Sequence, residues 1–129
     1  MPTPLKLLLV EDSKLLVERL SEVISQIADI DLVGTVDNEN DAVARLKGES
    51  VDVVILDLRL RQGTGFGVLR ALAGEKTRPR IVVLTTYDLP EYKSAALALG
   101  AGYFLDKARD CDRIPDVLNE IAEGLQPAG

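Results

Sequence analysis

Polar residues stand at the ends of apolar, strand-like runs of this chain, and the clearest case is Asp57. It directly follows the run Val53-Val54-Ile55-Leu56. A carboxylate at the end of a buried strand loses much of its hydration, which is costly unless a cation or hydrogen-bond donors compensate. The other residues placed in this way are Glu11, Asp12, Thr85 and Lys107.

Together these side chains have the chemistry of a metal-assisted phosphoryl-transfer site. Three clustered carboxylates repel one another, and one is pushed towards protonation unless a cation joins them. The chain has no histidine and a single cysteine, so Mg²⁺ with oxygen ligands is the natural candidate. Lys107 could neutralise a phosphoryl oxygen, Thr85 could donate a hydrogen bond to another, and an aspartate can accept the phosphoryl group covalently.

Each of these residues also has an ordinary structural explanation. Glu11 and Asp12 could be first-turn acids favoured by a helix dipole, and a lone lysine is usually a solvated surface charge. The sequence Gly63-Thr64-Gly65 resembles the start of a phosphate-binding loop, but Val68 occupies the place of the last glycine, so a turn before a helix is expected. These explanations do not account for four of five expected strands ending in parts of one site.

Five strand-like runs alternate with five segments of helical period. The expected strands are residues 5–10, 31–36, 51–56, 81–84 and 103–105. Ser13, Asn38 and Asp112 are the expected helix caps, Pro115 fits a first turn, and Gly124 and Pro127 should end the last helix.

This alternation predicts an α/β fold with a parallel sheet and helices on both faces. The near-continuous apolar strands indicate burial on both sides, and no repeat or linker suggests a second domain in residues 1–129. In such sheets ligands bind at the carboxyl ends of the strands, where the polar residues above would gather.

Composition narrows the function classes. A net charge of −6 and a pI near 4.6 disfavour direct binding to nucleic acid. No apolar run is long enough to span a bilayer, and the start of the chain does not read as a signal peptide, so no membrane partner is expected. Cys111 alone cannot form an internal disulfide, which fits a reducing cytoplasm.

Four stretches, LLLVEDS, VVILDLRLRQGTGF, VVLTTYD and LGAGYFLDKA, occur in this order along the chain. In them the sequence resembles the receiver domain of bacterial two-component response regulators, over essentially its whole length. The resemblance implies a flavodoxin-like sheet of order 2-1-3-4-5 with five helices. It also implies a single receiver domain, residues 1–129.

The resemblance implies a role for each polar residue. Asp57 would accept a phosphoryl group from a histidine kinase or a phosphotransfer protein. Asp12, Asp57 and the backbone carbonyl of Arg59 would hold Mg²⁺, with Glu11 in the same acidic pocket. Lys107 would bind the phosphoryl group. Thr85 and Phe104 would be the switch residues, and residues 89–124 would form the surface for a downstream protein. No enzymatic activity is expected beyond the chain's own phosphorylation and autodephosphorylation.

The chain departs from the family pattern at several positions. Ala108 replaces a frequent proline, so that a cis bond after Lys107 is not expected. Arg61 also stands where proline is frequent, Thr86 where alanine or glycine is usual, and Phe104 lacks a hydroxyl. Arg59 and Tyr87 flank the path of a hydrolytic water in this family, and neither is suited to orient one. They therefore suggest slow autodephosphorylation, and the Arg59 side chain could also reach Glu11 or a phosphoryl oxygen and fold over the site.

Alternative functions are weighed against the same residues. The receiver half of a truncated DNA-binding regulator is the main alternative. Residues 1–3 and 126–129 look like natural termini and favour a stand-alone receiver. A phosphatase of the haloacid dehalogenase type is not expected, because it needs a second aspartate where Arg59 stands. A flavodoxin-like flavin-binding protein is not expected either, because Glu11 and Asp12 stand where the flavin phosphate would need hydrogen-bond donors.

Overall fold

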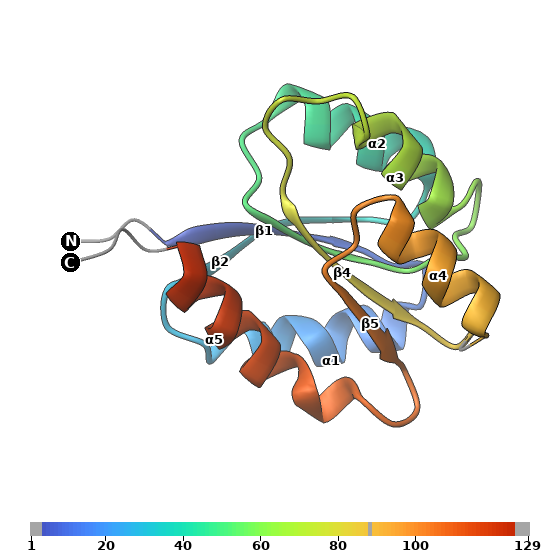
Figure 1. The fold of residues 1–129 in the computed structure, drawn as a ribbon. Helices are drawn as coiled ribbons and strands as arrows, with labels where there is room; N and C mark the ends of the chain where they lie inside the picture. Colours follow the sequence, from blue (N-terminus) through green and yellow to red (C-terminus); the bar gives the residue numbers. More distant parts are fainter. Residues whose placement is uncertain (1–3, 88, 126–129) are drawn as a thin grey trace.

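The computed structural model describes residues 4–87 and 89–125, which form one five-stranded sheet with helices on both faces (Figure 1). The strands are β1 (Leu5–Val10), β2 (Ile30–Val36), β3 (Val53–Leu56), β4 (Arg80–Thr85) and β5 (Tyr103–Asp106). The helices are α1 (Lys14–Ser25), α2 (Glu39–Gly48), α3 (Gly65–Leu72), α4 (Pro90–Ala98) and α5 (Ile114–Leu125), and a short 3₁₀ helix, η1 (Cys111–Arg113), precedes α5.

All strand pairs are parallel, and the order is β2-β1-β3-β4-β5, as expected. Helices α1 and α5 cover one face, whereas α2, α3 and α4 cover the other (Figure 1). Successive strand residues point to opposite faces, so β1 sends Leu8 and Val10 to the α2–α4 side and Leu7 and Leu9 to the α1–α5 side. This two-sided burial is why β3 and most of β1 and β4 are apolar, whereas β2 at the sheet edge is only partly buried.

Local sequence explains how the first three helices begin. Side-chain oxygens of Ser13, Asn38 and Thr64 accept hydrogen bonds from backbone N–H groups in the first turns of α1, α2 and α3. These bonds satisfy N–H groups that have no partner within the helix. The expected caps at Ser13 and Asn38 are therefore confirmed.

Two expectations for the last helix are wrong, although Pro115 lies in its first turn as expected. Asp112 lies inside η1 rather than capping α5, because the backbone turns at Asp110, whose carbonyl accepts from the Arg113 N–H. Gly124 lies within α5, which continues to Leu125. A Cβ at Gly124 would meet no atom within 4 Å, so its helical position is simply open to solvent. Pro127 and the termini at residues 1–3 and 126–129 lie outside the described residues.

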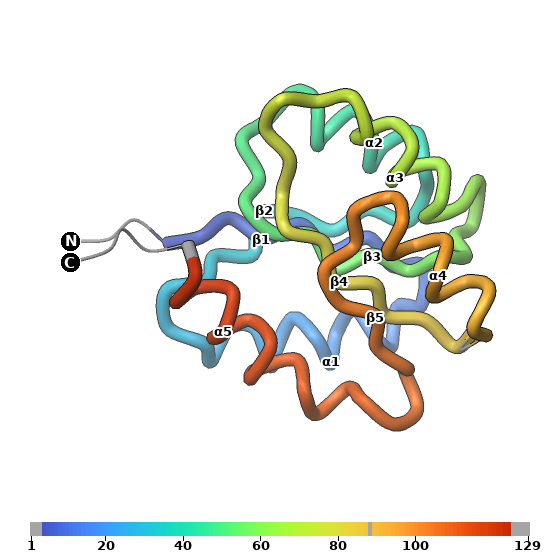
Figure 2. Tube along the Cα trace, in the orientation of Figure 1, coloured from blue at the N-terminus to red at the C-terminus, as the bar shows by residue number. Residues whose placement is uncertain are grey.

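The connections that leave β1, β3 and β5 lie together at one end of the molecule, opposite the end at which α5 finishes (Figure 2). No helix in the described ranges is long and apolar enough to cross a bilayer.

Candidate functional site

The sheet ladder continues past the strands and positions the residues that follow them. The Asp57 N–H donates to the Val10 carbonyl at 3.0 Å, and the Lys107 N–H donates to the Thr85 carbonyl at 3.0 Å. The residues that follow β3 and β5 are therefore held beside the ends of the neighbouring strands β1 and β4. Of the polar groups expected at this edge, Glu11, Asp57 and Thr85 are buried, with exposed fractions of 3%, 4% and 0%.

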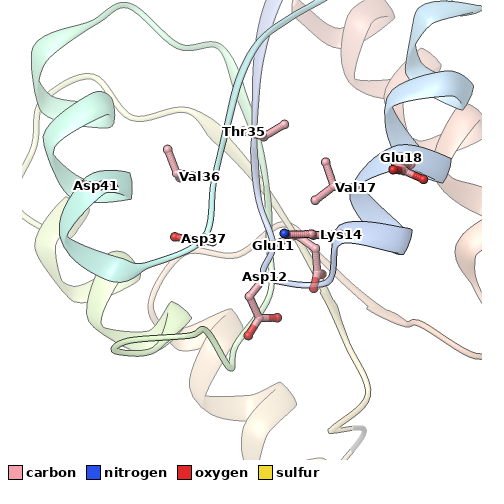
Figure 3. Close-up of a pocket in the computed structure, with 9 residues that line it drawn as sticks. All are labelled: Glu11, Asp12, Lys14, Val17, Glu18, Thr35, Val36, Asp37 and Asp41. Atoms are coloured by element: carbon pink, nitrogen blue, oxygen red, sulfur yellow. The ribbon is translucent and has the colours of Figure 1, made fainter.

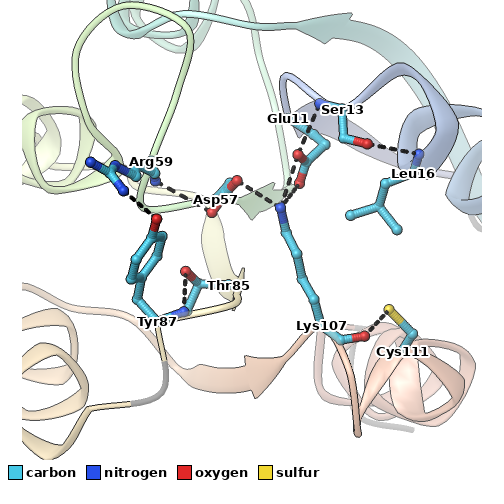
Figure 4. Close-up of polar contacts among 9 residues, drawn as sticks. All are labelled: Glu11, Ser13, Leu16, Asp57, Arg59, Thr85, Tyr87, Lys107 and Cys111. Atoms are coloured by element: carbon cyan, nitrogen blue, oxygen red, sulfur yellow. Dashed lines mark hydrogen bonds and ion pairs between the residues drawn. The ribbon is translucent and has the colours of Figure 1, made fainter.

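Lys107 neutralises two of the carboxylates directly (Figure 4). Its Nζ lies 2.8 Å from Asp57 Oδ2 and 2.9 Å from Glu11 Oε2. Burial by itself lowers the pKa of Lys107, but the hydrogen bonds and charges of Asp57 and Glu11 outweigh burial and raise it. The ammonium therefore remains charged in this pocket.

The carboxyl of Glu11 has a raised pKa. Burial is the largest cause, and the negative charge of Asp57 adds to it, while the hydrogen bond from Lys107 opposes both. Burial and the neighbouring carboxylate thus disfavour the charged form of Glu11 even with Lys107 in place.

Glu11, Asp12 and Asp57 each offer a carboxylate oxygen, and these oxygens lie within 4.8 Å of one another. Asp12 is exposed, whereas the other two are buried. An all-oxygen donor set with more carboxylates than ammonium groups fits a hard divalent cation, and an exposed side leaves room for the waters that Mg²⁺ retains. The residues present therefore fit Mg²⁺.

Arg59 and Tyr87 meet each other beside Asp57 (Figure 4). The Arg59 guanidinium donates a hydrogen bond to the Tyr87 hydroxyl, and its central carbon lies 5.1 Å from the centroid of the Tyr87 ring. The Arg59 N–H also faces Asp57 Oδ1 at 3.3 Å. The Arg59 side chain thus contacts Tyr87 and not Glu11, one of its expected partners.

The switch candidates lie on neighbouring strands. Thr85 Oγ1 accepts a hydrogen bond from the Tyr87 N–H at 3.1 Å, so its hydroxyl is engaged with the β4–α4 connection. Phe104 pairs with Val83 across the sheet and is half-buried against the cluster beneath α2–α4. No cis peptide bond occurs in the described ranges, as expected for Lys107-Ala108.

Two hollows open at this edge. One, of about 340 Å³, lies over the carboxylates and is lined by residues that include Asp12, Asp57, Arg59 and Lys107. A second, of about 450 Å³, lies between α1 and the start of α2 and shares Glu11 and Asp12 with the site (Figure 3). The first places open space directly next to Asp57, as a phosphoryl donor requires.

Sequence reasoning missed two contributions to this edge. Asp37, the residue that follows β2, pairs with Arg61, and this pairing lowers the pKa of Asp37 to about 2. Asp37 obeys the same rule of a polar residue after a strand, which could have identified it. The Cys111 thiol donates to the Lys107 carbonyl at 3.0 Å, a contact that no sequence signal marks.

Comparison with known proteins agrees with this geometry. A family model described as "Response regulator receiver domain" matches residues 7–119. The sensory transduction protein LytT of Bacillus anthracis is 30% identical over 95% of this chain, which corresponds to 49% of that protein. Protein-glutamate methylesterase/protein-glutamine glutaminase 5 of Myxococcus xanthus is 35% identical over 98% of this chain and 37% of its own length. The chain thus spans half or less of these curated relatives.

Solved structures show the same fold over nearly the whole chain. The signal receiver domain of the putative response regulator NarL from Mycobacterium tuberculosis has a TM-score of 0.86 and 25% identity, covering 95% of this chain and 99% of that one. The response regulatory domain of mrkE from Klebsiella pneumoniae has a TM-score of 0.84, with 25% identity over 93% of this chain and 97% of that one. The buried acids, the lysine that joins them and the matching family model lead to one conclusion: this chain belongs to the receiver domain family of two-component response regulators.

Proposed function

We propose that this chain, as one receiver domain over residues 1–129, accepts a phosphoryl group on Asp57 from a histidine kinase or a phosphotransfer protein. The observation that carries the proposal is the pairing of Asp57 Oδ2 with Lys107 Nζ at 2.8 Å, beside the oxygens of Glu11 and Asp12. An Asp57 oxygen forms the new bond to phosphorus, and the bond from phosphorus to the donor's nitrogen or oxygen breaks with its electron pair leaving on the donor.

The surrounding residues have distinct parts in this step. Lys107 pairs with the transferred phosphoryl oxygens, and Thr85 holds one of them through its hydroxyl. Mg²⁺, held by Asp12, Asp57 and the carbonyl of Arg59 beside Glu11, would supply charge neutralisation on the phosphoryl oxygens. The transfer needs little more than this positioning and charge. Intact-mass spectrometry after incubation with acetyl phosphate and Mg²⁺ tests the proposal.

The chain would act on no other substrate, and the methylesterase activity named for one relative belongs to that longer protein. The proposal concerns the receiver itself and holds equally for a stand-alone chain and for the receiver half of a DNA-binding regulator.

The site of action would be the cytoplasm, because cysteines such as Cys111 that form no disulfide are common in its reducing environment.

The output would be a change of the surface formed by α4, β5 and α5. Helix α4 supports this role because little of it is buried, and Leu89, Tyr92 and Leu97 are 48%, 37% and 43% exposed. A ligand shifts a conformational equilibrium only by binding one state more tightly. Thr85 would turn from the Tyr87 N–H towards the phosphoryl group, and Phe104 would turn further inward.

Beryllofluoride, a stand-in for the phosphoryl group, should therefore move backbone amide resonances of residues 85–87, of α4 and of β5. Nuclear magnetic resonance spectra with and without it, both containing Mg²⁺, measure the effect. The Asp57→Asn variant is the control and should show none of these shifts. Changes confined to α1 and α2 would contradict the proposed output surface.

The lifetime of the phosphoryl group would depend on Arg59 and Tyr87. Hydrolysis needs a water in line with phosphorus, opposite the Asp57 oxygen. The Arg59–Tyr87 contact supports a barrier beside Asp57, because it joins two large side chains, and neither can act as a base for water. Slow autodephosphorylation would be the consequence.

Arg59→Asn and Tyr87→Glu should each speed dephosphorylation, by on the order of tenfold if each removes about 1.4 kcal/mol from the barrier. The decay of the phosphorylated mass after removal of acetyl phosphate measures the rate. Arg70→Asn, at an exposed arginine on α3, is the matched control. Unchanged decay in both site variants would show that the pair does not restrict water.

A further inference from the structure

The loop that follows Asp57, residues 58–64, is fastened to the connection between β2 and α2. Its backbone takes part in two hydrogen bonds across this junction: the Arg61 N–H donates to the Asp37 carbonyl at 3.2 Å, and the Gln62 carbonyl accepts from the Glu39 N–H at 3.0 Å. Asn38 and Gln62 form an isolated parallel bridge. The sheet thus gains a short extra pairing beyond its carboxyl edge.

An ion pair reinforces this junction. The Arg61 guanidinium contacts both oxygens of the Asp37 carboxylate, with Nε 3.0 Å from Oδ2 and Nη2 3.1 Å from Oδ1. Both side chains are about half exposed, and single exposed ion pairs usually contribute little unless the geometry is bidentate, as it is here. The buried Asn38 amide also donates to Asp37 Oδ1, at 2.9 Å, and so gives the carboxylate a third hydrogen bond.

The far end of the loop is held as well. Glu39 Oε1 accepts from the Thr64 N–H at 3.0 Å. Gly63 has a φ of 79°, and a Cβ there would overlap the Glu39 side chain, so only glycine permits this close approach. Arg59 and Thr64 form an antiparallel bridge, which folds the loop back on itself. Fixing residues 61–64 therefore also fixes the backbone of Arg59.

We propose that Asp37 and Arg61 are positioning residues for the metal site, which act by fixing the backbone carbonyl of Arg59. This inference rests on the proposed binding of Mg²⁺ by Asp12, Asp57 and that carbonyl. Mg²⁺ demands near-ideal octahedral geometry, so a displaced carbonyl lowers its affinity. In the part of the chain that the structure describes, the hydrogen bonds and ion pair of Asp37 and Arg61 do not involve Glu11, Asp12 or Asp57, so the pair would act through the loop.

The Arg61→Ala variant distinguishes a positioning role from a purely electrostatic one, because the two predict opposite changes in Mg²⁺ affinity. Removing a positive charge near an acidic site should tighten Mg²⁺ binding if charge alone matters. Loss of positioning should instead weaken Mg²⁺ binding by about tenfold. This is the lower end of the loss in metal affinity that follows when a residue supporting a metal ligand is removed. Arg61→Lys keeps the charge but loses the bidentate contact, so an intermediate affinity is expected.

Isothermal titration with MgCl₂ measures these affinities. Amide hydrogen exchange of Thr64 and Gly65 in EDTA measures how firmly the loop is held when no metal is bound. This exchange should be faster in Arg61→Ala than in the wild type. Lys47→Ala is the matched control, since it removes an exposed ion pair with Glu75 from the opposite end of α2. It should change neither measurement.

The outcomes distinguish this inference from the proposed function. Absence of Mg²⁺ binding by the wild-type protein would overturn both. Normal binding by the wild type, with equal or tighter binding by Arg61→Ala, would overturn the positioning role alone. Weaker binding together with faster loop exchange, absent from Lys47→Ala, would establish it.

Discussion

No phosphoryl adduct is expected on the Asp57→Asn variant after incubation with acetyl phosphate and Mg²⁺. An amide lacks the anionic oxygen that forms the bond to phosphorus. Asparagine has nearly the same shape as aspartate, and its oxygen can still accept from the Arg59 N–H, so the β3–α3 loop should be preserved. Loss of the adduct would then reflect lost chemistry rather than a lost fold.

Intact-mass spectrometry distinguishes the modified from the unmodified chain, and far-UV circular dichroism checks the fold. Asp31→Asn, at an exposed aspartate on β2, is the matched control and should be modified like the wild type. Wild-type protein in EDTA should also lack the adduct, because without a divalent cation the acidic pocket repels an anionic donor. A full-strength adduct on Asp57→Asn would move the acceptor to another residue.

The Lys107→Gln variant is expected to lose about 3 kcal/mol of unfolding free energy in EDTA, the lower end of the cost of breaking a buried ion pair. Glu11 and Asp57 would be left buried without their cation, since Lys107 Nζ lies within 3.0 Å of both carboxylates. Urea unfolding measures the loss. Lys93→Gln, on the exposed surface of α4, should leave stability nearly unchanged.

Mg²⁺ should restore part of the stability of Lys107→Gln. A cation that binds only the folded state stabilises it by mass action, and in this variant no ammonium competes for Asp57. The rise in unfolding free energy on adding Mg²⁺ should therefore be larger in the variant than in the wild type. An equal or smaller rise would contradict the placement of the metal beside Lys107.

The stability difference between the wild type and Lys107→Gln should also depend on pH. The folded-state pKa of Lys107 is raised above its ordinary value of 10.5, so its stabilising contribution is complete below that value. The contribution is lost as the pH rises through the folded-state pKa. The stability difference between wild type and Lys107→Gln should therefore narrow in strongly alkaline solution, and a difference that grew there would contradict the ion pair.

The fold could be predicted from sequence because its signals are local. Apolar runs of strand length, helical periodicity and the caps at Ser13 and Asn38 act within a few residues, and parallel strands then need helices on both faces. The edge at which Glu11, Asp12, Asp57, Thr85 and Lys107 meet follows from the same topology, since parallel strands end on one side of a sheet. The start of the last helix was less predictable, because a turn at Asp110 and a short 3₁₀ helix replaced the cap expected at Asp112.

Only the tertiary structure decided which side chains pair at that edge. Lys107 is 96 residues from Glu11 and 50 from Asp57, yet its ammonium joins both at hydrogen-bond distance. Arg59 contacts Tyr87 instead of Glu11, and Arg61 reaches back 24 residues to Asp37. Long charged side chains have several partners within reach. The choice among them depends on how the helices and loops pack, and local sequence does not encode that packing.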